Sequence, residues 1–229
     1  MANICNLHPE SDIFMNGKCI CCHNEMKLKQ RNKKLDKIYQ HLSIVSNIPA
    51  RYRHAALDSA LIDYSIQQKA INCFKANPYS NFLLVGKTGT GKTHFGCALI
   101  HHLISQQEYT DEQFADFDDR RIENMKSDYR YIKFYQLTDL KIKDYSSFLK
   151  ILNCKMLVID EVANNFSEFK QALLFEIIDA RYDEMLPTTL ITNLEIKQFA
   201  PMLSDALKSR LHNHVMLEFD IKDYRKEQE

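Results

Sequence analysis

The sequence has no net charge, no apolar run of membrane length and no internal repeat. Thirty basic and thirty acidic side chains cancel, so the overall charge indicates no nucleic-acid partner, and any basic surface has to be local. No apolar run approaches the roughly 18 to 20 residues that span a bilayer. The first residues lack the basic start and apolar stretch of a secretory signal. We therefore expect a cytoplasmic protein with no membrane partner.

The composition suits a soluble protein with a buried core. Of the 229 residues, 45% are hydrophobic and 26% are charged, which is typical of a globular protein. The length allows one large domain with a small appendage. Four of the seven cysteines fall within the first 22 residues. In a reducing compartment such cysteines bind metal or are buried more often than they form disulfides.

Three stretches of different character divide the chain. Residues 1–24 contain the cysteine cluster but too few large apolar residues for a core, so this segment needs a cross-link or a metal to fold. Residues 25–48 predict a basic linker helix, and Pro49 ends it because the residue before proline avoids the helical conformation. Residues 49–229 form the third and largest stretch. The basic residues of the linker helix are Lys27, Lys29, Arg31, Lys33, Lys34 and Lys37.

Strand and helix patterns alternate along the largest stretch. Strands are expected at residues 81–85, 131–135, 156–159, 188–192 and 215–219. Helices are expected at residues 57–76, 93–105, 137–151, 168–184 and 195–210. This alternation predicts an α/β fold with a parallel five-stranded sheet that helices cover on both faces. Residues 106–128 are acidic, have little apolar periodicity and are expected to form a surface insertion.

A glycine-rich motif follows the first predicted strand. Residues 86–93 read GKTGTGKT, between the apolar run FLLV and a predicted helix, and they fit the P-loop pattern. The glycines let successive backbone N–H groups point at phosphates at the helix N-terminus. Lys92 would bind the phosphates of ATP, and the Thr93 hydroxyl would bind Mg²⁺. The expected nucleotide-binding residues are Gly86, Thr88, Gly89, Thr90, Gly91, Lys92, Thr93 and His94.

Polar side chains also end two later strands. The apolar strand MLVI is followed by Asp160, which would hold Mg²⁺ directly or through water, and Glu161, which would polarise the attacking water. Asn193 follows the strand TTLIT and could lie near the γ-phosphate, although a strand-end Asn is more often a turn residue. Arg210 could reach the nucleotide of a neighbouring subunit, although a lone arginine after a helix is more often solvated.

The N-terminal cysteines form ligand pairs with metal-binding spacing. Two residues separate the members of each pair, as in zinc sites held by two short knuckles. Cys21 and His23 are spare candidates, and His23 could replace one of the four. The alternative is a disordered tail with incidental cysteines. The candidate zinc ligands are Cys5, His8, Cys19 and Cys22.

Taken together, these motifs resemble the AAA+ ATPases of the DnaC/DnaI helicase-loader and IstB type. The resemblance covers about residues 47–226, through NIPARYRHAALDS, GKTGTGKTHFGCALIHHL, MLVIDEV, IIDARYDEMLPTTLITNL and SDALKSRL. The chain departs from the family at Ala163, where Gly is frequent, and at Thr192, where Ser is frequent. Only 19 residues follow Arg210, so the resemblance implies an AAA+ domain without a C-terminal lid. It also implies roles for Lys92 and Thr93 (Walker A), Asp160 and Glu161 (Walker B), Asn193 (sensor 1), Arg210 (trans-acting finger) and Arg181 (a second inter-subunit or sensor residue).

The resemblance implies an ATP-dependent loader of a DnaB-type replicative helicase that also contacts single-stranded DNA and self-assembles through Arg210. An IstB-like transposition helper with a transposase partner remains the alternative, while a small-molecule kinase is disfavoured by the Asp160-Glu161 pair. By resemblance, the DNA contacts would come from the helix after the second strand, through Lys141, Lys143 and Tyr145. The other interpretation of this helix, a solvated basic face, stands beside it, as it does for residues 25–42.

Overall fold

The computed structural model describes residues 7–8, 14–15, 18–59, 64–77, 80–163 and 166–219. These residues divide into two compact units. The helical unit comprises Met1–His41 and Asp111–Met125, and the sheet unit comprises Leu42–Thr110 and Lys126–Glu229. Within the described ranges, none of the helices combines the length and apolarity needed to cross a bilayer.

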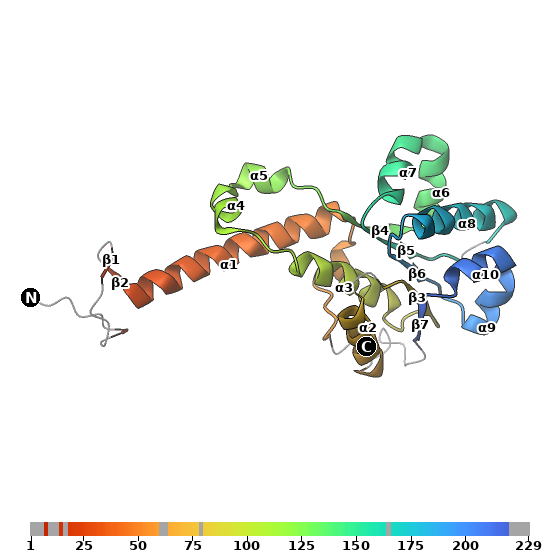
Figure 1. Ribbon diagram of the computed structural model, residues 1–229, viewed down its shortest axis with the longest axis horizontal. Helices are drawn as coiled ribbons and strands as arrows, with labels where there is room; N and C mark the ends of the chain where they lie inside the picture. The colour runs from red at the N-terminus through yellow and green to blue at the C-terminus, as the bar shows by residue number, and fades with distance from the viewer. Residues whose placement is uncertain are drawn as a thin grey trace, which may run out of the picture. The chain divides into compact units, whose positions relative to one another are not determined.

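A five-stranded parallel sheet forms the centre of the sheet unit, as the sequence predicts (Figure 1). The central strands are buried along their whole length, because helices cover both faces. The strand order departs from the chain order, which requires crossover connections. The strands lie in the order β4 (Tyr129–Lys133), β5 (Met156–Asp160), β6 (Thr188–Ile191), β3 (Phe82–Val85) and β7 (Val215–Glu218).

The helices of the sheet unit form two layers. On one face, α3 (Lys92–Ser105) packs against β4, β5 and β6. A Cβ atom at Gly96 of this helix would lie 2.7 Å from Ile191 Cδ1 and 3.0 Å from Val158 Cγ1, so the glycine permits the close approach of α3 to the sheet. The opposite face carries the larger apolar core, into which Leu157 and Ile159 point. The helices on that face are α6 (Phe134–Lys143), α7 (Tyr145–Leu152), α8 (Glu168–Asp183), α9 (Ile196–Phe199) and α10 (Asp205–Leu211).

Several element boundaries differ from the sequence-based expectations for local reasons. The helix expected at residues 137–151 is two helices, because Asp144 leaves the helical conformation and its side chain caps α7 by accepting a bond from Ser147 N at 3.1 Å. The helix expected at residues 195–210 breaks around η2 (Ala200–Met202), which contains Pro201. Two further helical segments complete this unit: η1 (Ala50–Tyr52) and α2 (Tyr64–Ala76).

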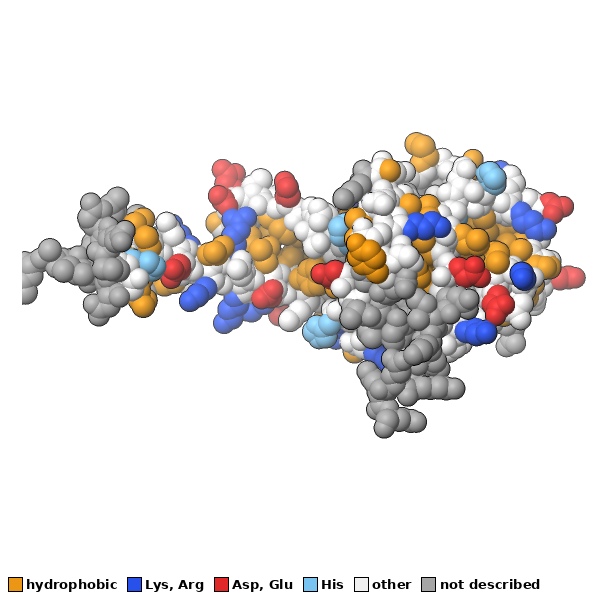
Figure 2. Space-filling view, turned by 90° about the horizontal axis from the view of Figure 1, so that it is seen from below, with side chains coloured by type: hydrophobic (Ala, Val, Ile, Leu, Met, Phe, Trp, Pro, Cys, Tyr) orange, Lys and Arg blue, Asp and Glu red, His pale blue; other side chains and the backbone are white. Residues whose placement is uncertain are grey.

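The helical unit is built on α1 (Ile20–Val45), which starts before the expected residue 25 and whose last turn lies in the sheet unit. A short antiparallel pair, β1 (Phe14–Met15) and β2 (Lys18–Cys19), precedes the helix. The acidic insertion forms α4 (Asp111–Asp116) and α5 (Asp119–Glu123). Its carboxylates pair with the basic helix: Arg31 binds Asp111 at 2.6 Å and Lys37 binds Asp119 at 2.7 Å. On the face drawn in Figure 2, basic and acidic side chains are interspersed, in keeping with the balanced composition.

Candidate functional site

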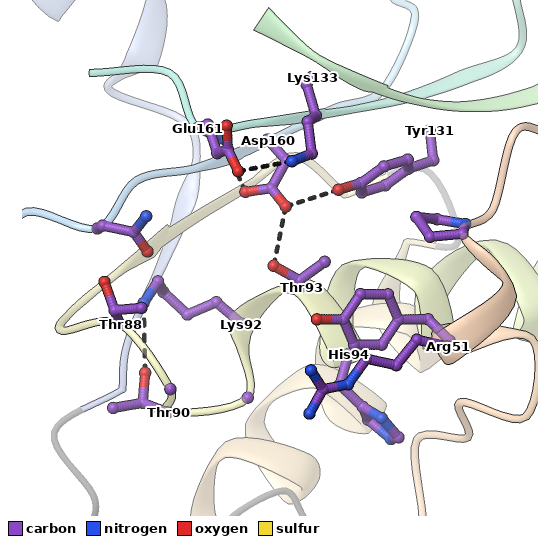
Figure 3. Close-up of a pocket in the computed structure, with 15 residues that line it drawn as sticks. Arg51, Thr88, Thr90, Lys92, Thr93, His94, Tyr131, Lys133, Asp160 and Glu161 are labelled. Atoms are coloured by element: carbon purple, nitrogen blue, oxygen red, sulfur yellow. Dashed lines mark hydrogen bonds and ion pairs between the residues drawn. The ribbon is translucent and has the colours of Figure 1, made fainter. Parts of the chain in front are cut away.

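A cavity of about 640 Å³ opens at the carboxyl ends of the parallel strands (Figure 3). This edge of an α/β sheet is where such folds place ligands. The P-loop, Asp160 at the end of β5, Glu161 directly after it and the Asn after β6 all meet there, although they are far apart in the sequence. The lining residues are Pro49, Arg51, Tyr52, Thr88, Gly89, Thr90, Gly91, Lys92, Thr93, His94, Tyr131, Lys133, Asp160, Glu161 and Asn193.

The P-loop has the backbone geometry of an anion-binding loop. Gly86, Gly89 and Gly91 have φ values of 130°, 89° and 92°, which residues other than glycine rarely adopt. At Gly86 a Cβ atom would also lie 2.2 Å from the Phe219 carbonyl oxygen. The loop ends at Lys92, the first residue of α3, so the positive end of the helix dipole faces the cavity.

The side chain of Lys92 lies inside this loop and is 3% exposed. Its Nζ donates hydrogen bonds to Gly86 O at 2.7 Å, Lys87 O at 2.5 Å and Thr90 Oγ1 at 3.3 Å. These neutral acceptors hold the ammonium group at the centre of the loop. Phosphate oxygens accept stronger, charge-assisted bonds from an ammonium group than carbonyl oxygens do, so Lys92 is placed to exchange these partners for phosphate.

Asp160 receives three hydrogen bonds at this edge of the sheet. Its Oδ2 accepts from Thr93 Oγ1 at 2.8 Å and from the Tyr131 hydroxyl at 2.7 Å, while its Oδ1 accepts from Glu161 N at 2.7 Å. Figure 3 shows Thr93 and Tyr131 reaching Asp160 from two directions. A hydroxyl beside a carboxylate is a donor set that Mg²⁺ prefers, and it adjoins a phosphate-binding loop. The residues present therefore fit a nucleotide with its magnesium ion.

Tyr131 was not singled out from the sequence. It lies on β4, is 3% exposed and faces the acid at the end of the neighbouring strand. Burial, and then the negative charge of Asp160, raise the pKa of this tyrosine far above its usual value, so its hydroxyl keeps its proton and acts as a donor. The sequence signal that could have indicated Tyr131 is a polar aromatic residue on β4, the strand that precedes the acid-ended strand β5 in the chain.

Glu161 is held by a second β4 residue that the sequence reasoning missed. Lys133 Nζ lies 2.8 Å from Glu161 Oε1, with side chains 36% and 30% exposed. The hydrogen bond to Glu161 raises the pKa of Lys133. Glu161 has a φ of 59°, an unusual value for a residue other than glycine. Backbone strain of this kind is found most often at functional sites. The candidate catalytic base therefore sits at a strained position with a cationic partner.

The remaining wall of the cavity comes from the end of β6 and from η1. Asn193 follows β6, while Arg51 and Tyr52 come from η1, ahead of the sheet. The rings of Tyr52 and His94 meet edge to face with centroids 6.5 Å apart. Burial lowers the pKa of His94. The residues of η1 belong to the segment that carries the family resemblance, but no local pattern places them at the nucleotide site.

The two arginines expected at a subunit interface lie in different environments. Arg210 is outside the cavity lining: its Nε donates to Asp179 Oδ1 at 2.7 Å, and its guanidinium lies 5.0 Å from the centre of the Tyr182 ring. Arg181, expected to be a second inter-subunit or sensor residue, is only 1% exposed, which leaves no surface for an inter-subunit contact, and it does not line the cavity. Its guanidinium donates to Leu152 O, Cys154 O, Pro187 O and Thr188 Oγ1.

The expected DNA-contacting residues are partly engaged within the sheet unit. Lys141 pairs with Glu176 and lies 4.7 Å from the Tyr145 ring centre. Tyr145 is 52% exposed and stacks on Phe148. Lys143 makes a longer ion pair with Asp139 at 3.7 Å. An exposed aromatic ring beside lysines is compatible with base stacking, and the DNA contact stays a prediction.

In the helical unit, three of the candidate metal ligands lie together. His8 Nδ1 is 3.3 Å from Cys22 Sγ and 3.6 Å from Cys19 Sγ. These distances match the roughly 3.5 Å between nitrogen and sulfur ligands of a tetrahedral zinc ion. The Cys22 N–H also donates to Cys19 Sγ at 3.3 Å, and His8 Nε2 lies 3.1 Å from Glu25 Oε1, as in carboxylate–histidine–metal arrangements.

The other candidate ligands stand apart or cannot be placed. Cys5 lies outside the described residues. Cys21 is exposed, and neither it nor His23 belongs to the group formed by His8, Cys19 and Cys22. Three described side chains can therefore hold a metal ion.

Comparisons with known proteins identify the family of the chain. The family model described as IstB-like ATP binding protein matches residues 59–229. The replicative helicase loader DnaC of Buchnera aphidicola subsp. Acyrthosiphon pisum is 25% identical over 190 residues, which cover 79% of this chain and 73% of the relative.

Solved structures with the same fold include two proteins of related name. A crystal structure of the DnaC helicase loader matches with a TM-score of 0.54 and 21% identity, over 75% of this chain and 100% of that chain. A crystal structure of DnaI matches with a TM-score of 0.56 and 19% identity, over 77% of this chain and 93% of that chain. At these identities the structural likeness concerns the fold alone.

Proposed function

Because the chain belongs to the family of IstB-like ATP binding proteins and is an ATPase with the AAA+ fold, we propose that it loads a DnaB-type replicative helicase during DNA replication. The observation that carries this proposal is the similarity to proteins named replicative helicase loaders over 79% of the chain. The nucleotide-driven step of such a loader needs the phosphate loop, the metal carboxylate and the base that meet in the cavity.

The chain's own residues supply the steps of ATP hydrolysis. The N–H groups of the P-loop and the Lys92 ammonium bind the phosphates, exchanging the carbonyl partners of Lys92 for phosphate oxygens. Thr93 and Asp160 would hold Mg²⁺, which neutralises charge that develops on the phosphates. Glu161 orients the attacking water and accepts its proton, and the bond from Lys133 to Oε1 leaves Oε2 for this task. Asn193 donates toward the γ-phosphate from the end of β6.

Assembly and partner binding complete the proposed cycle. ATP-bound copies associate side by side, Arg210 leaves Asp179 and completes the site of the neighbouring copy, and single-stranded DNA contacts Lys143 and Tyr145. The N-terminal segment binds zinc through His8, Cys19, Cys22 and Cys5, and it grips the helicase. Hydrolysis then lets the loader leave. This work would take place in the cytoplasm.

A second function uses the same ATPase site. In an IstB-like transposition helper, ATP would switch a DNA-bound assembly whose partner is a transposase. The match to the IstB-like family model favours it, while the metal-ligand group ahead of the ATPase and the similarity to helicase loaders favour the first function.

Affinity capture from the native cell lysate tests the proposal. The Glu161→Gln variant with ATP should trap the assembled state, because it keeps the phosphate-binding residues and loses the base. We expect mass spectrometry to identify a DnaB-type helicase, and deletion of residues 1–46 to abolish its recovery. Lys92→Ala, which removes the phosphate-binding ammonium, is the matched control and should recover far less partner. Recovery of a transposase instead would assign the second function and leave the ATPase site unaffected.

A further inference from the structure

Strand β4 supplies two side chains to the nucleotide cavity, although neither belongs to the motifs recognised in the sequence. In the parallel register, Tyr131 lies opposite Val158 and Lys133 opposite Asp160. Residues two apart on a strand point to the same face of the sheet. Both side chains line the cavity at the carboxyl end of β5, together with Asp160 and Glu161. Tyr131 holds Asp160 and Lys133 holds Glu161. Each carboxylate therefore has its own donor on β4.

We propose that Tyr131 is a positioning residue for the magnesium site, whose hydroxyl fixes the orientation of the Asp160 carboxylate. The proposal rests on the ATPase function of the same cavity. It concerns a side chain that acts through the carboxylate that it touches.

The hydrogen bonds around Asp160 explain why one hydroxyl matters. Oδ2 accepts from both Thr93 and Tyr131, and Oδ1 accepts from the backbone of Glu161. The oxygen of the Thr93 hydroxyl can bind a cation through a lone pair while its O–H group still donates to Asp160. The bond from Tyr131 comes from a neighbouring strand, so it fixes the plane of the carboxylate independently of the P-loop. Without it, the donors to the Asp160 carboxylate within the described part of the chain would be Thr93 Oγ1 and Glu161 N.

The hydrogen bond between Tyr131 and Asp160 is buried, which limits the access of water to both side chains. Tyr131 is 3% exposed and Asp160 is 4% exposed, so water is poorly placed to replace a lost hydroxyl. The Tyr131 ring is held by packing, and removing its oxygen leaves the ring in place. Outer-sphere hydrogen bonds to metal ligands typically change metal affinity or activity by about 10- to 100-fold.

The Tyr131→Phe variant tests the proposal through its dependence on Mg²⁺. We expect the Mg²⁺ concentration for half-maximal ATP hydrolysis to rise about tenfold. Binding of a fluorescent ATP analogue, titrated with Mg²⁺, should show the same shift without any turnover. In the absence of Mg²⁺ the analogue should bind both proteins equally, because the P-loop and Lys92 are intact. Tyr64→Phe, at a tyrosine that is 72% exposed on α2, is the matched control and should behave as the wild type.

Two results would overturn the positioning role. One is an unchanged Mg²⁺ dependence in Tyr131→Phe. The other is an equal loss of analogue affinity with and without Mg²⁺, which would assign Tyr131 a purely structural role in the pocket. If the wild-type protein itself shows no Mg²⁺-dependent ATP binding or hydrolysis, the ATPase function of the cavity fails, and that outcome is distinct from both.

Discussion

Arg181 and Arg210 of the sheet unit carry the same charge but differ in burial, and burial determines which groups each guanidinium can contact. The Arg181 guanidinium bridges carbonyl oxygens at the ends of α7 and β6, far from solvent. Burial lowers its pKa, although not enough to remove the charge of a guanidinium group. Arg210 instead lies on the surface of α10, beside Asp179 and Tyr182. Of these two arginines, Arg210 is the one that a second copy of the chain could reach.

Alanine substitutions should separate these roles. Arg181→Ala leaves several buried carbonyl groups without a donor, so we expect the free energy of unfolding to fall by about 3 kcal/mol or more. Arg210→Ala should leave the urea unfolding midpoint nearly unchanged and lower the ATPase rate of the assembled protein. Urea titration and ATPase assays over a range of protein concentrations measure both effects. A stable Arg181→Ala protein with a specific assembly defect would contradict the structural role.

At the scale of elements, the start of α1 lies within the group of candidate metal ligands. Cys19 directly precedes the helix and Cys22 lies in its first turn, while His8 comes from a separate segment. Metal binding at these three side chains would join the segment to the helix. Since few apolar side chains are available there, the metal would contribute much of the local folding energy.

Metal analysis checks this dependence. We expect about one zinc ion per chain in protein purified without chelators. Cys19→Ser should lose the metal, whereas Cys21→Ser, at an exposed cysteine outside the group, should retain it. Chelation should reduce helical circular dichroism and leave ATP binding by the sheet unit intact. Zinc that persists in Cys19→Ser, or that disappears from Cys21→Ser, would contradict this ligand set.

At the scale of the whole molecule, we expect one buried and two partly buried histidines to make stability depend on pH. Burial lowers the pKa of His94, His101 and His214, the last to about 4. Both ring nitrogens of His214 are buried without a hydrogen-bond partner among the described residues. In the unfolded chain a histidine titrates near 6.5. Below that pH the unfolded state binds protons that the folded state excludes, so stability is lost as the pH falls.

We therefore expect the free energy of unfolding to decrease between about pH 6.5 and pH 4, with His214 contributing up to about 3 kcal/mol. Replacing this side chain by an apolar one, His214→Phe, should flatten the pH profile of urea unfolding in that range. His212→Gln, at the exposed neighbouring histidine, is the control and should leave the profile unchanged. A profile in His214→Phe as steep as in the wild type would show that other groups dominate the acid response.

The sequence alone determined the class of the fold and the chemistry of the nucleotide site. The P-loop, the acid-ended strand β5 and the alternation of apolar strands and helices are local patterns, and each predicts its own structure from residues close together in the chain. The parallel five-stranded sheet followed from them, because crossover helices bring the carboxyl ends of parallel strands to one edge. The boundaries at Asp144 and Pro201 were harder to predict, because a short side-chain cap or a single proline decides them.

Only the tertiary structure decided which other side chains reach that edge and which arginine is buried. Tyr131 and Lys133 became part of the site through the register of β4 on β5, and Arg51 through the position of η1. By resemblance, Arg181 was expected to be an inter-subunit or sensor residue, but the packing of α8 buries it. Hydrogen-bond partners 27 to 29 residues apart, such as Tyr131 with Asp160 or Arg181 with Cys154, leave no local pattern in the sequence. Strand order and packing alone bring such groups within bonding distance.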